Sequence, residues 1–117
     1  MKVSMRLRRR GGRKARLYMK AVAMPQGTLV FDPALRIKGM AGGGLVFVEA
    51  TSPVPLLGMG RTVRGALREL GGNLVWLWRE YAEAKEQELT GDARELARCF
   101  RAIARRENRG WAASAAG

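Results

Sequence analysis

The chain has 117 residues, 47% of them hydrophobic and 27% charged, and this length and composition predict one globular domain with one modest core. Its formal net charge is +12, it has no histidine, and Cys99 is its single cysteine, so an intrachain disulfide is excluded and the commonest general base is missing. No run approaches the ~20 apolar residues of a membrane-spanning helix. We therefore expect a cytoplasmic protein that makes no membrane contact.

The positive charge is concentrated at the N-terminal end. Residues 1–20 hold nine of the 22 basic side chains and none of the 10 acidic ones. Residues 1–14 are predicted to be a flexible basic arm, because like charges repel and glycine loses much backbone entropy on folding.

Two interpretations of this arm stay open. A run of guanidinium groups suits phosphate backbones, which makes the arm a candidate nucleic-acid-binding segment. The alternative is a solvated tail, or an upstream extension. The candidate nucleic-acid-binding residues are Arg8, Arg9, Arg10, Arg13, Lys14 and Arg16.

Two extended segments are expected after the arm. Residues 15–24 alternate apolar and polar side chains with the period of a strand. The apolar face of this strand is predicted to carry Leu17, Met19, Ala21 and Ala23. Residues 28–31 resume the extended run after Pro25, and Asp32-Pro33 is expected to end it.

A β-hairpin is predicted next. Residues 35–38 alternate in the manner of a half-buried strand, and residues 45–50 form a β-branched and aromatic run of strand length. Residues 40–44 separate the two runs, and their glycines supply the positive φ values that tight turns demand.

One long amphipathic helix is predicted to follow a proline-bearing loop. Thr62 is a good N-cap, and Gly58 and Gly60 permit a sharp entry. The apolar stripe, which must bury against something, consists of Val63, Ala66, Leu67, Leu70, Leu74, Leu77, Trp78 and Tyr81. Gly71-Gly72 marks a weak point, a kink or a break; continuity is favoured, since the stripe keeps its phase across the pair.

The order of hairpin, G-x-G-x-T loop (Gly58, Gly60, Thr62) and capped helix with Ala66-Leu67 resembles the HicB-like family over residues 35–81. The resemblance implies a partial RNase H-like α+β domain that binds and occludes HicA, a small mRNA-cleaving toxin. Many family members also carry a DNA-binding segment. Residues 63–65 (Val-Arg-Gly) stand where the family usually has acids.

A second helix is predicted from the turn at Thr90 to the arginines that precede Asn108, forming a helical hairpin with the first. Cys99 is expected to be a buried thiol beside Phe100. Residues 108–117 are predicted to be a disordered tail. The predicted fold is therefore α+β, with a small antiparallel sheet of three to four strands packed by one long helix, plus a C-terminal helix. Residues 15–107 would form this single domain.

Trp76 and Val75 lie off the main stripe and are the candidate partner-binding residues, unless the second helix covers them. Asp32 and Glu49 are isolated carboxylates, for which structural or solvent-facing roles are expected, so the chain is predicted not to be an enzyme and to hold no metal or cofactor.

The leading hypothesis is a non-catalytic HicB-like binding module for a HicA-type toxin or another protein, forming a homo-oligomer. The alternative is a nucleic-acid-binding protein that uses its arginine-rich arm.

Overall fold

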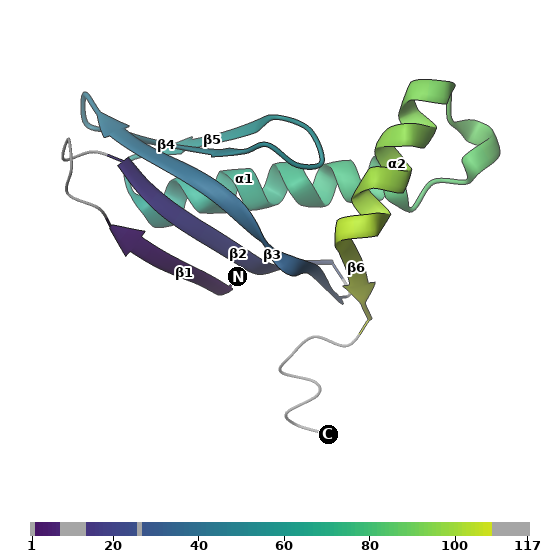
Figure 1. The fold of residues 1–117 in the computed structure, drawn as a ribbon, viewed down its shortest axis with the longest axis horizontal. Helices are drawn as coiled ribbons and strands as arrows, with labels where there is room; N and C mark the ends of the chain where they lie inside the picture. Colours follow the sequence, from purple (N-terminus) through teal and green to yellow (C-terminus); the bar gives the residue numbers. More distant parts are fainter. Residues whose placement is uncertain (1, 8–13, 26, 109–117) are drawn as a thin grey trace, which may run out of the picture.

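The computed structural model describes residues 2–7, 14–25 and 27–108 and has an α+β fold, as predicted (Figure 1). Five strands form an antiparallel sheet in the order β1-β2-β3-β4-β5, and a sixth strand, β6, pairs with β3. Helix α1 lies along one face of this sheet, and α2 stands at one end (Figure 1). The strands are β1 (Lys2–Leu7), β2 (Lys14–Met24), β3 (Gly27–Gly42), β4 (Leu45–Ala50), β5 (Leu56–Gly60) and β6 (Ala104–Glu107), and the helices are α1 (Val63–Leu77) and α2 (Gly91–Ile103).

Part of the predicted flexible arm is a strand. β1 pairs antiparallel with β2, with Arg6 opposite Arg16 and Leu7 opposite Ala15. The prediction of an unstructured arm over residues 1–14 is therefore wrong for this segment, because the edge of β2 offers it backbone partners that the charge pattern does not reveal. Residues 8–13 lie outside the described residues.

β3 is one long strand that runs through Asp32-Pro33, where a break was predicted. Its first part pairs with β6 and its second part with β4, and Pro33 falls where the partner strand changes. A proline there removes no ladder hydrogen bond. The β2–β3 register also shifts between Met19 and Ala21, and this irregularity buries Val22 and leaves Ala23 exposed, contrary to the simple alternation predicted.

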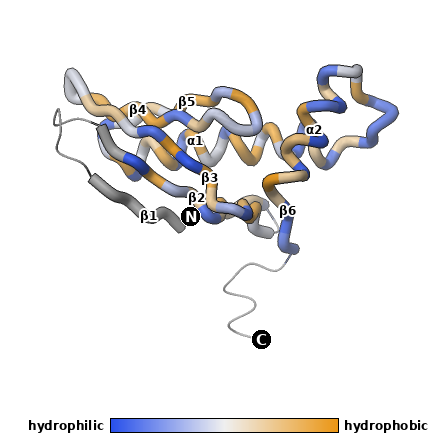
Figure 2. Tube along the Cα trace, in the orientation of Figure 1, coloured by the Kyte–Doolittle hydropathy of each residue, from blue (hydrophilic) through white to orange (hydrophobic). Residues whose placement is uncertain are grey.

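The predicted hairpin is confirmed as β3 and β4, with Gly43 and Gly44 at positive φ in the turn. The segment before the helix is a further strand, β5, which pairs with β4. Figure 2 shows apolar and polar residues alternating along these strands, as expected where one face of a sheet is buried.

Helix α1 begins at its predicted cap and continues through the glycine pair. The Thr62 Oγ1 atom accepts a hydrogen bond of 3.0 Å from the Gly65 backbone N–H. After Leu77 the helix continues as a π-helical segment, Trp78–Ala82. Its apolar face and the facing strands share one core, whose largest fully buried side chains are Phe100, Leu17, Met19, Leu29, Ile37, Leu70, Leu74 and Val48.

Gly58 and Gly60 serve close packing instead of an unusual backbone angle. A Cβ atom on Gly58 would clash with the Ala66 carbonyl oxygen and would lie 2.7 Å from the Leu70 backbone nitrogen. A Cβ atom on Gly60 would lie 2.7 Å from the Ala66 nitrogen. The two glycines therefore let α1 lie directly on β5.

The C-terminal helix is shorter than predicted. α2 ends at Ile103, and the next four residues form β6 along the first part of β3, so the predicted helical hairpin ends in a strand. Phe100 packs between Phe31 and Trp78, with ring centroids 6.5 and 5.2 Å away. Cys99 is exposed and not buried as predicted, because it lies off the stripe that faces this aromatic cluster.

Candidate functional site

The face of the sheet opposite α1 carries the candidate site. Side chains alternate between the two faces of each strand, so residues that flank the buried Leu17, Ile37 and Val48 point the other way. Cross-strand partners share a face. The outward-facing set, called the open face here, consists of Arg16, Tyr18, Arg36, Lys38, Met40, Phe47, Glu49, Leu57 and Met59.

One half of the open face is basic. Arg16 on β2 lies directly opposite Lys38 on β3, and Tyr18 lies opposite Arg36. On the other side of β2, strand β1 places Arg6 opposite Arg16. Three basic residues are therefore in register across β1, β2 and β3. Like charges directly opposite one another destabilise a sheet.

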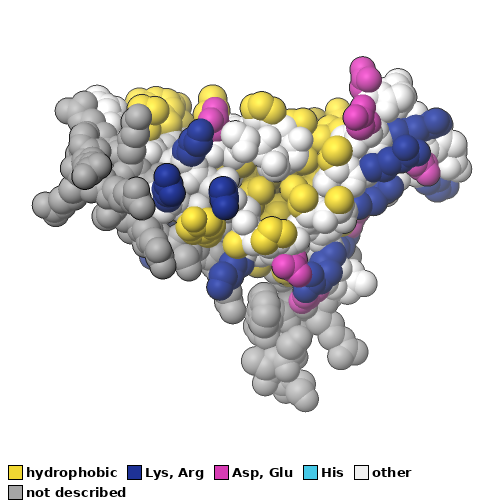
Figure 3. Space-filling view, in the orientation of Figure 1, with side chains coloured by type: hydrophobic (Ala, Val, Ile, Leu, Met, Phe, Trp, Pro, Cys, Tyr) yellow, Lys and Arg dark blue, Asp and Glu magenta, His cyan; other side chains and the backbone are white. Residues whose placement is uncertain are grey.

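Few acids balance this basic half. Glu49 is the opposite residue to Lys38 on β4, yet the ion pairs found among the described residues all lie elsewhere, in the C-terminal part. In Figure 3 blue basic side chains and a magenta acidic group lie over the sheet, and further magenta groups lie at the end of the molecule that holds α2 and β6. The open face therefore presents a positive potential to solvent.

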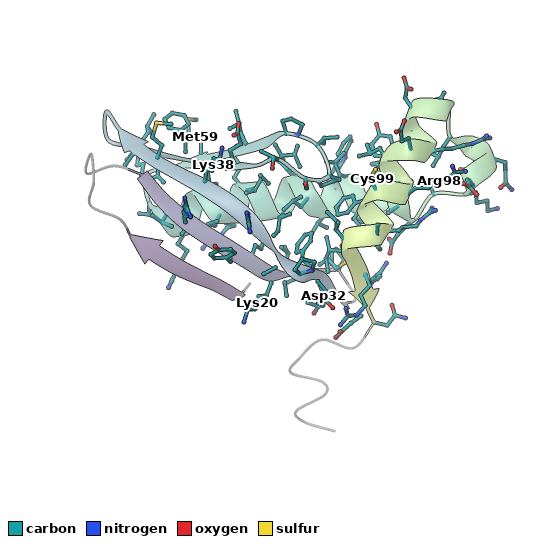
Figure 4. The ribbon with its side chains drawn as sticks, in the orientation of Figure 1. Lys20, Asp32, Lys38, Met59, Arg98 and Cys99 are labelled. Atoms are coloured by element: carbon teal, nitrogen blue, oxygen red, sulfur yellow. The ribbon has the colours of Figure 1, made fainter. Side chains whose placement is uncertain are left out.

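The other half of the open face is apolar. Met40, Phe47 and Met59 form one cross-strand row, and Leu57 lies in the row beside it. These four side chains are between 39 and 58% exposed. Figure 3 shows yellow hydrophobic side chains next to blue basic ones on this face, and Figure 4 labels Lys38 and Met59 in this region. Exposed apolar side chains gathered in this way are typical of binding surfaces.

The predicted arm residues are only partly placed. Arg8, Arg9, Arg10 and Arg13 lie outside the described residues. Lys14 is the first residue of β2, opposite Met40, and Arg16 is exposed on the open face. The described end of the predicted nucleic-acid segment thus joins the sheet at its basic half.

The predicted Trp76–Val75 surface pair does not form. Trp76 is 57% exposed on the outer side of α1, whereas Val75 is only 8% exposed and belongs to the core. The helical period explains the difference, since Val75 follows Leu74 toward the sheet and Trp76 turns away. Tyr81 contacts Trp76 edge-on, with ring centroids 6.4 Å apart.

Sequence reasoning missed the other residues of the open face. The alternation of residues 35–38 placed Arg36 and Lys38 on a polar side, but it did not show that this side stays uncovered. Phe47 lies in a run that resembles a fully buried strand. Only the position of α1, on a single face, reveals that its ring is exposed.

The two isolated carboxylates lie far apart. Asp32 is on β3, next to the residue that pairs with Ala104 of β6. Glu49 is on β4, opposite Lys38. Because Lys38 follows Asp32 by six residues along β3, the two carboxylates are roughly 20 Å apart. Figure 4 shows Asp32 near the β6 end of the sheet. Within the part of the chain that the structure describes, no group of three or more potential metal-ligating side chains occurs.

Comparison with known proteins found no matching family model, no matching curated protein and no matching solved structure. None of the helices in the described ranges is long and apolar enough to cross a lipid bilayer.

Proposed function

We propose that this protein is a non-catalytic binding module whose open face binds nucleic acid. The observation that carries the proposal is the row of basic residues across β1, β2 and β3, with Arg16 opposite Lys38. Placing like charges in register lowers the stability of a sheet, and a polyanion that neutralises them removes this repulsion.

The chemistry of the surface fits a phosphate backbone. Arginine and lysine that neutralise phosphates release condensed counterions, which gives affinity independent of base sequence. The net charge of +12 favours long-range attraction of the same kind of ligand. Because β2 begins at Lys14, the arginine-rich residues 8–13 precede the basic half directly and would extend the same contact.

The test compares two sets of three substitutions that change the net charge equally. Arg16→Gln, Arg36→Gln and Lys38→Gln together remove the basic half of the open face. The matched control replaces Arg61, Arg64 and Arg68, exposed residues at the start of α1 on the other side of the sheet.

Binding of fluorescent 20-nucleotide probes is measured by anisotropy over a series of salt concentrations. Each phosphate contact contributes about 0.7–0.9 to the slope of log K against log salt, so the open-face variant is expected to lose about 2 from that slope. The control is expected to keep both slope and affinity. Equal losses in the two variants would reject the open face as the site.

The arm is tested by replacement, not deletion. Removing residues 1–16 also removes β1 and the start of β2, so a loss of binding has two explanations. Replacing Arg8, Arg9, Arg10 and Arg13 with glutamine leaves both strands intact. A further fall in the salt slope supports the arm as a nucleic-acid contact, and an unchanged slope identifies it as a solvated segment.

The HicB-like interpretation is the second candidate. The topology favours it, since hairpin, β5 and capped α1 follow one another in the order that the resemblance implies. The net charge of +12 is evidence against it, because a basic protein is a poor electrostatic match for a basic nuclease. Co-expression with the product of an adjacent gene for a small basic nuclease is the test: a stable complex that suppresses RNA cleavage supports this candidate, and independent purification of the two proteins rejects it.

A further inference from the structure

Tyr18 and Phe47 are the two aromatic residues of the open face, and they lie on either side of its basic row. Tyr18 is opposite Arg36 on β3, and Phe47 is opposite Met40, four residues further along the same strand. The two residues are two strands apart across the sheet and four residues apart along it, so their positions are separated by roughly 16 Å on the diagonal. Arg16 and Lys38 occupy the row between them.

We infer that the open face binds single-stranded nucleic acid, with unpaired bases stacked on Tyr18 and Phe47 and the intervening phosphates on Arg16 and Lys38. The inference rests on the proposed function and names the class of nucleic acid that this site selects. Aromatic side chains on the exposed face of a sheet can bind unpaired strands by stacking, because every base has a π-face.

The surroundings of Phe47 support a stacking role. Its ring is 39% exposed, and its cross-strand neighbours are Met40 on one side and Met59 on the other. Methionine thioethers are polarizable and adaptable, so they widen the apolar platform beneath a flat base. This apolar row adds little binding free energy to a contact with a phosphate backbone alone. An exposed base that lies on it buries apolar surface and therefore binds more tightly.

A duplex uses only part of this surface. Its base faces are stacked inside the helix, so a duplex meets the cations of the basic half but leaves Phe47 and its methionine neighbours without a partner. A single strand engages both halves at once. The arrangement of charge and aromatic surface on one face therefore favours unpaired nucleic acid over duplex.

A second copy of the chain is a poorer occupant of this face. Two open faces packed on each other would bring Arg16, Arg36 and Lys38 of each copy into one interface that offers only Glu49 as a counter-charge. Like charges enclosed in an interface cost several kcal/mol. Charge complementarity thus selects a polyanion, and the aromatic rings select a polyanion that carries planar groups.

The experiment separates stacking from charge. Tyr18→Thr and Phe47→Thr remove one ring each, keep every charge and keep a residue suited to a strand. Leu57→Thr removes an aliphatic side chain of the same apolar half and is expected to weaken single-strand binding less than Phe47→Thr does, because Leu57 is more exposed than Phe47 but has no ring. Trp76→Ala is the aromatic control on the outer side of α1. Circular dichroism confirms that each variant is folded.

Each protein is titrated with 12-nucleotide poly(U) and poly(dT) and with a 12-base-pair duplex. We expect each ring substitution to weaken binding of the single strands at least about 5-fold, with the salt slope and the duplex affinity unchanged. Trp76→Ala is expected to bind as the wild type does, and Phe47→Trp, which keeps an aromatic ring, is expected to bind single strands as tightly as the wild type. The poly(U) and poly(dT) titrations together show whether the site prefers RNA or DNA.

Three outcomes would overturn the inference. The first is equal affinity for single strands and duplex with no effect of Phe47→Thr; if the open-face cations are still required, the proposed function stands and only the stacking fails. The second is binding of poly-glutamate as tight as that of poly(U), which indicates an acidic polypeptide ligand. The third is a protein dimer that Phe47→Thr dissociates, which assigns the apolar half to a second copy.

Discussion

Arg16 and Lys38 stand directly opposite each other on β2 and β3, although both carry a positive charge. On the other side of β2, the backbone of Arg16 pairs with that of Arg6 in β1. An arrangement that weakens the sheet and exposes charge is expected where a surface is shaped for binding and not for stability.

The first prediction is that Arg16→Gln stabilises the free protein. Removing this charge relieves the cross-strand repulsion with Lys38, worth about 0.2–1 kcal/mol, so the free energy of unfolding in urea is expected to rise by about that much at low salt. Arg16→Lys, which keeps the charge, is expected to bring no gain. A gain that persists unchanged in 1 M salt would contradict the electrostatic explanation.

The second prediction concerns the two threonines that precede the helices. The Thr62 hydroxyl accepts a hydrogen bond from Gly65 at the start of α1, whereas the Thr90 side chain makes no such bond at α2. Thr62→Ala is therefore expected to lower the free energy of unfolding by about 1 kcal/mol. Thr90→Ala serves as the matched control and is expected to cost clearly less. Equal losses would show that the capping bond is not what Thr62 contributes.

The third prediction tests the contact between β5 and α1. Gly58→Ala forces a methyl group onto the backbone of Ala66 and Leu70, where no flexible side chain can move aside, and is expected to cost about 3 kcal/mol or more. Gly42→Ala is the control, because a Cβ atom there meets nothing within 4 Å. Thermal melts of the two variants make the comparison, and similar melting temperatures would refute the close-packing role of Gly58.

The fourth prediction concerns two neighbouring arginines of β6. Arg106 donates to the Glu83 carboxylate at 2.7 Å and to the Pro25 carbonyl at 2.9 Å, which fastens β6 to the end of the long helix and to the β2–β3 turn. Arg105 makes only an exposed ion pair with Glu107. We expect Arg106→Gln to cost about 1–2 kcal/mol and Arg105→Gln to lie within about 0.5 kcal/mol of the wild type in urea unfolding.

The fifth prediction addresses self-association. If the predicted homo-oligomer forms through the outer side of α1, Trp76→Ala lowers the mass measured by light scattering, because an exposed tryptophan is a typical interface anchor. Stability per chain is expected to change little, since the side chain is mostly exposed. Phe47→Thr should leave the mass unchanged. A wild-type protein that is monomeric at all concentrations would refute the prediction.

Local sequence signals were sufficient for much of the fold. Thr62, the apolar period after it and the glycines at residues 42–44 each act through a few neighbouring residues, so the capped helix and the hairpin were predictable. β1 and β6 were not, because each depends on the free edge of a strand that is distant in the sequence. β6 in particular was assigned to a helix, since its arginines suit a helix end as well as an exposed strand.

The candidate site shows the same division. The sequence by itself determined the charge and the alternation of Arg36 and Lys38, because these follow from composition and from the period of the strand, whereas it left open whether the second helix covers Trp76. Only the tertiary structure decided that Arg16 faces Lys38, that Val75 is buried and that Phe47 is exposed. The reason is physical: strand register and the side on which α1 packs are settled by contacts between distant segments, and these contacts leave one face of the sheet open.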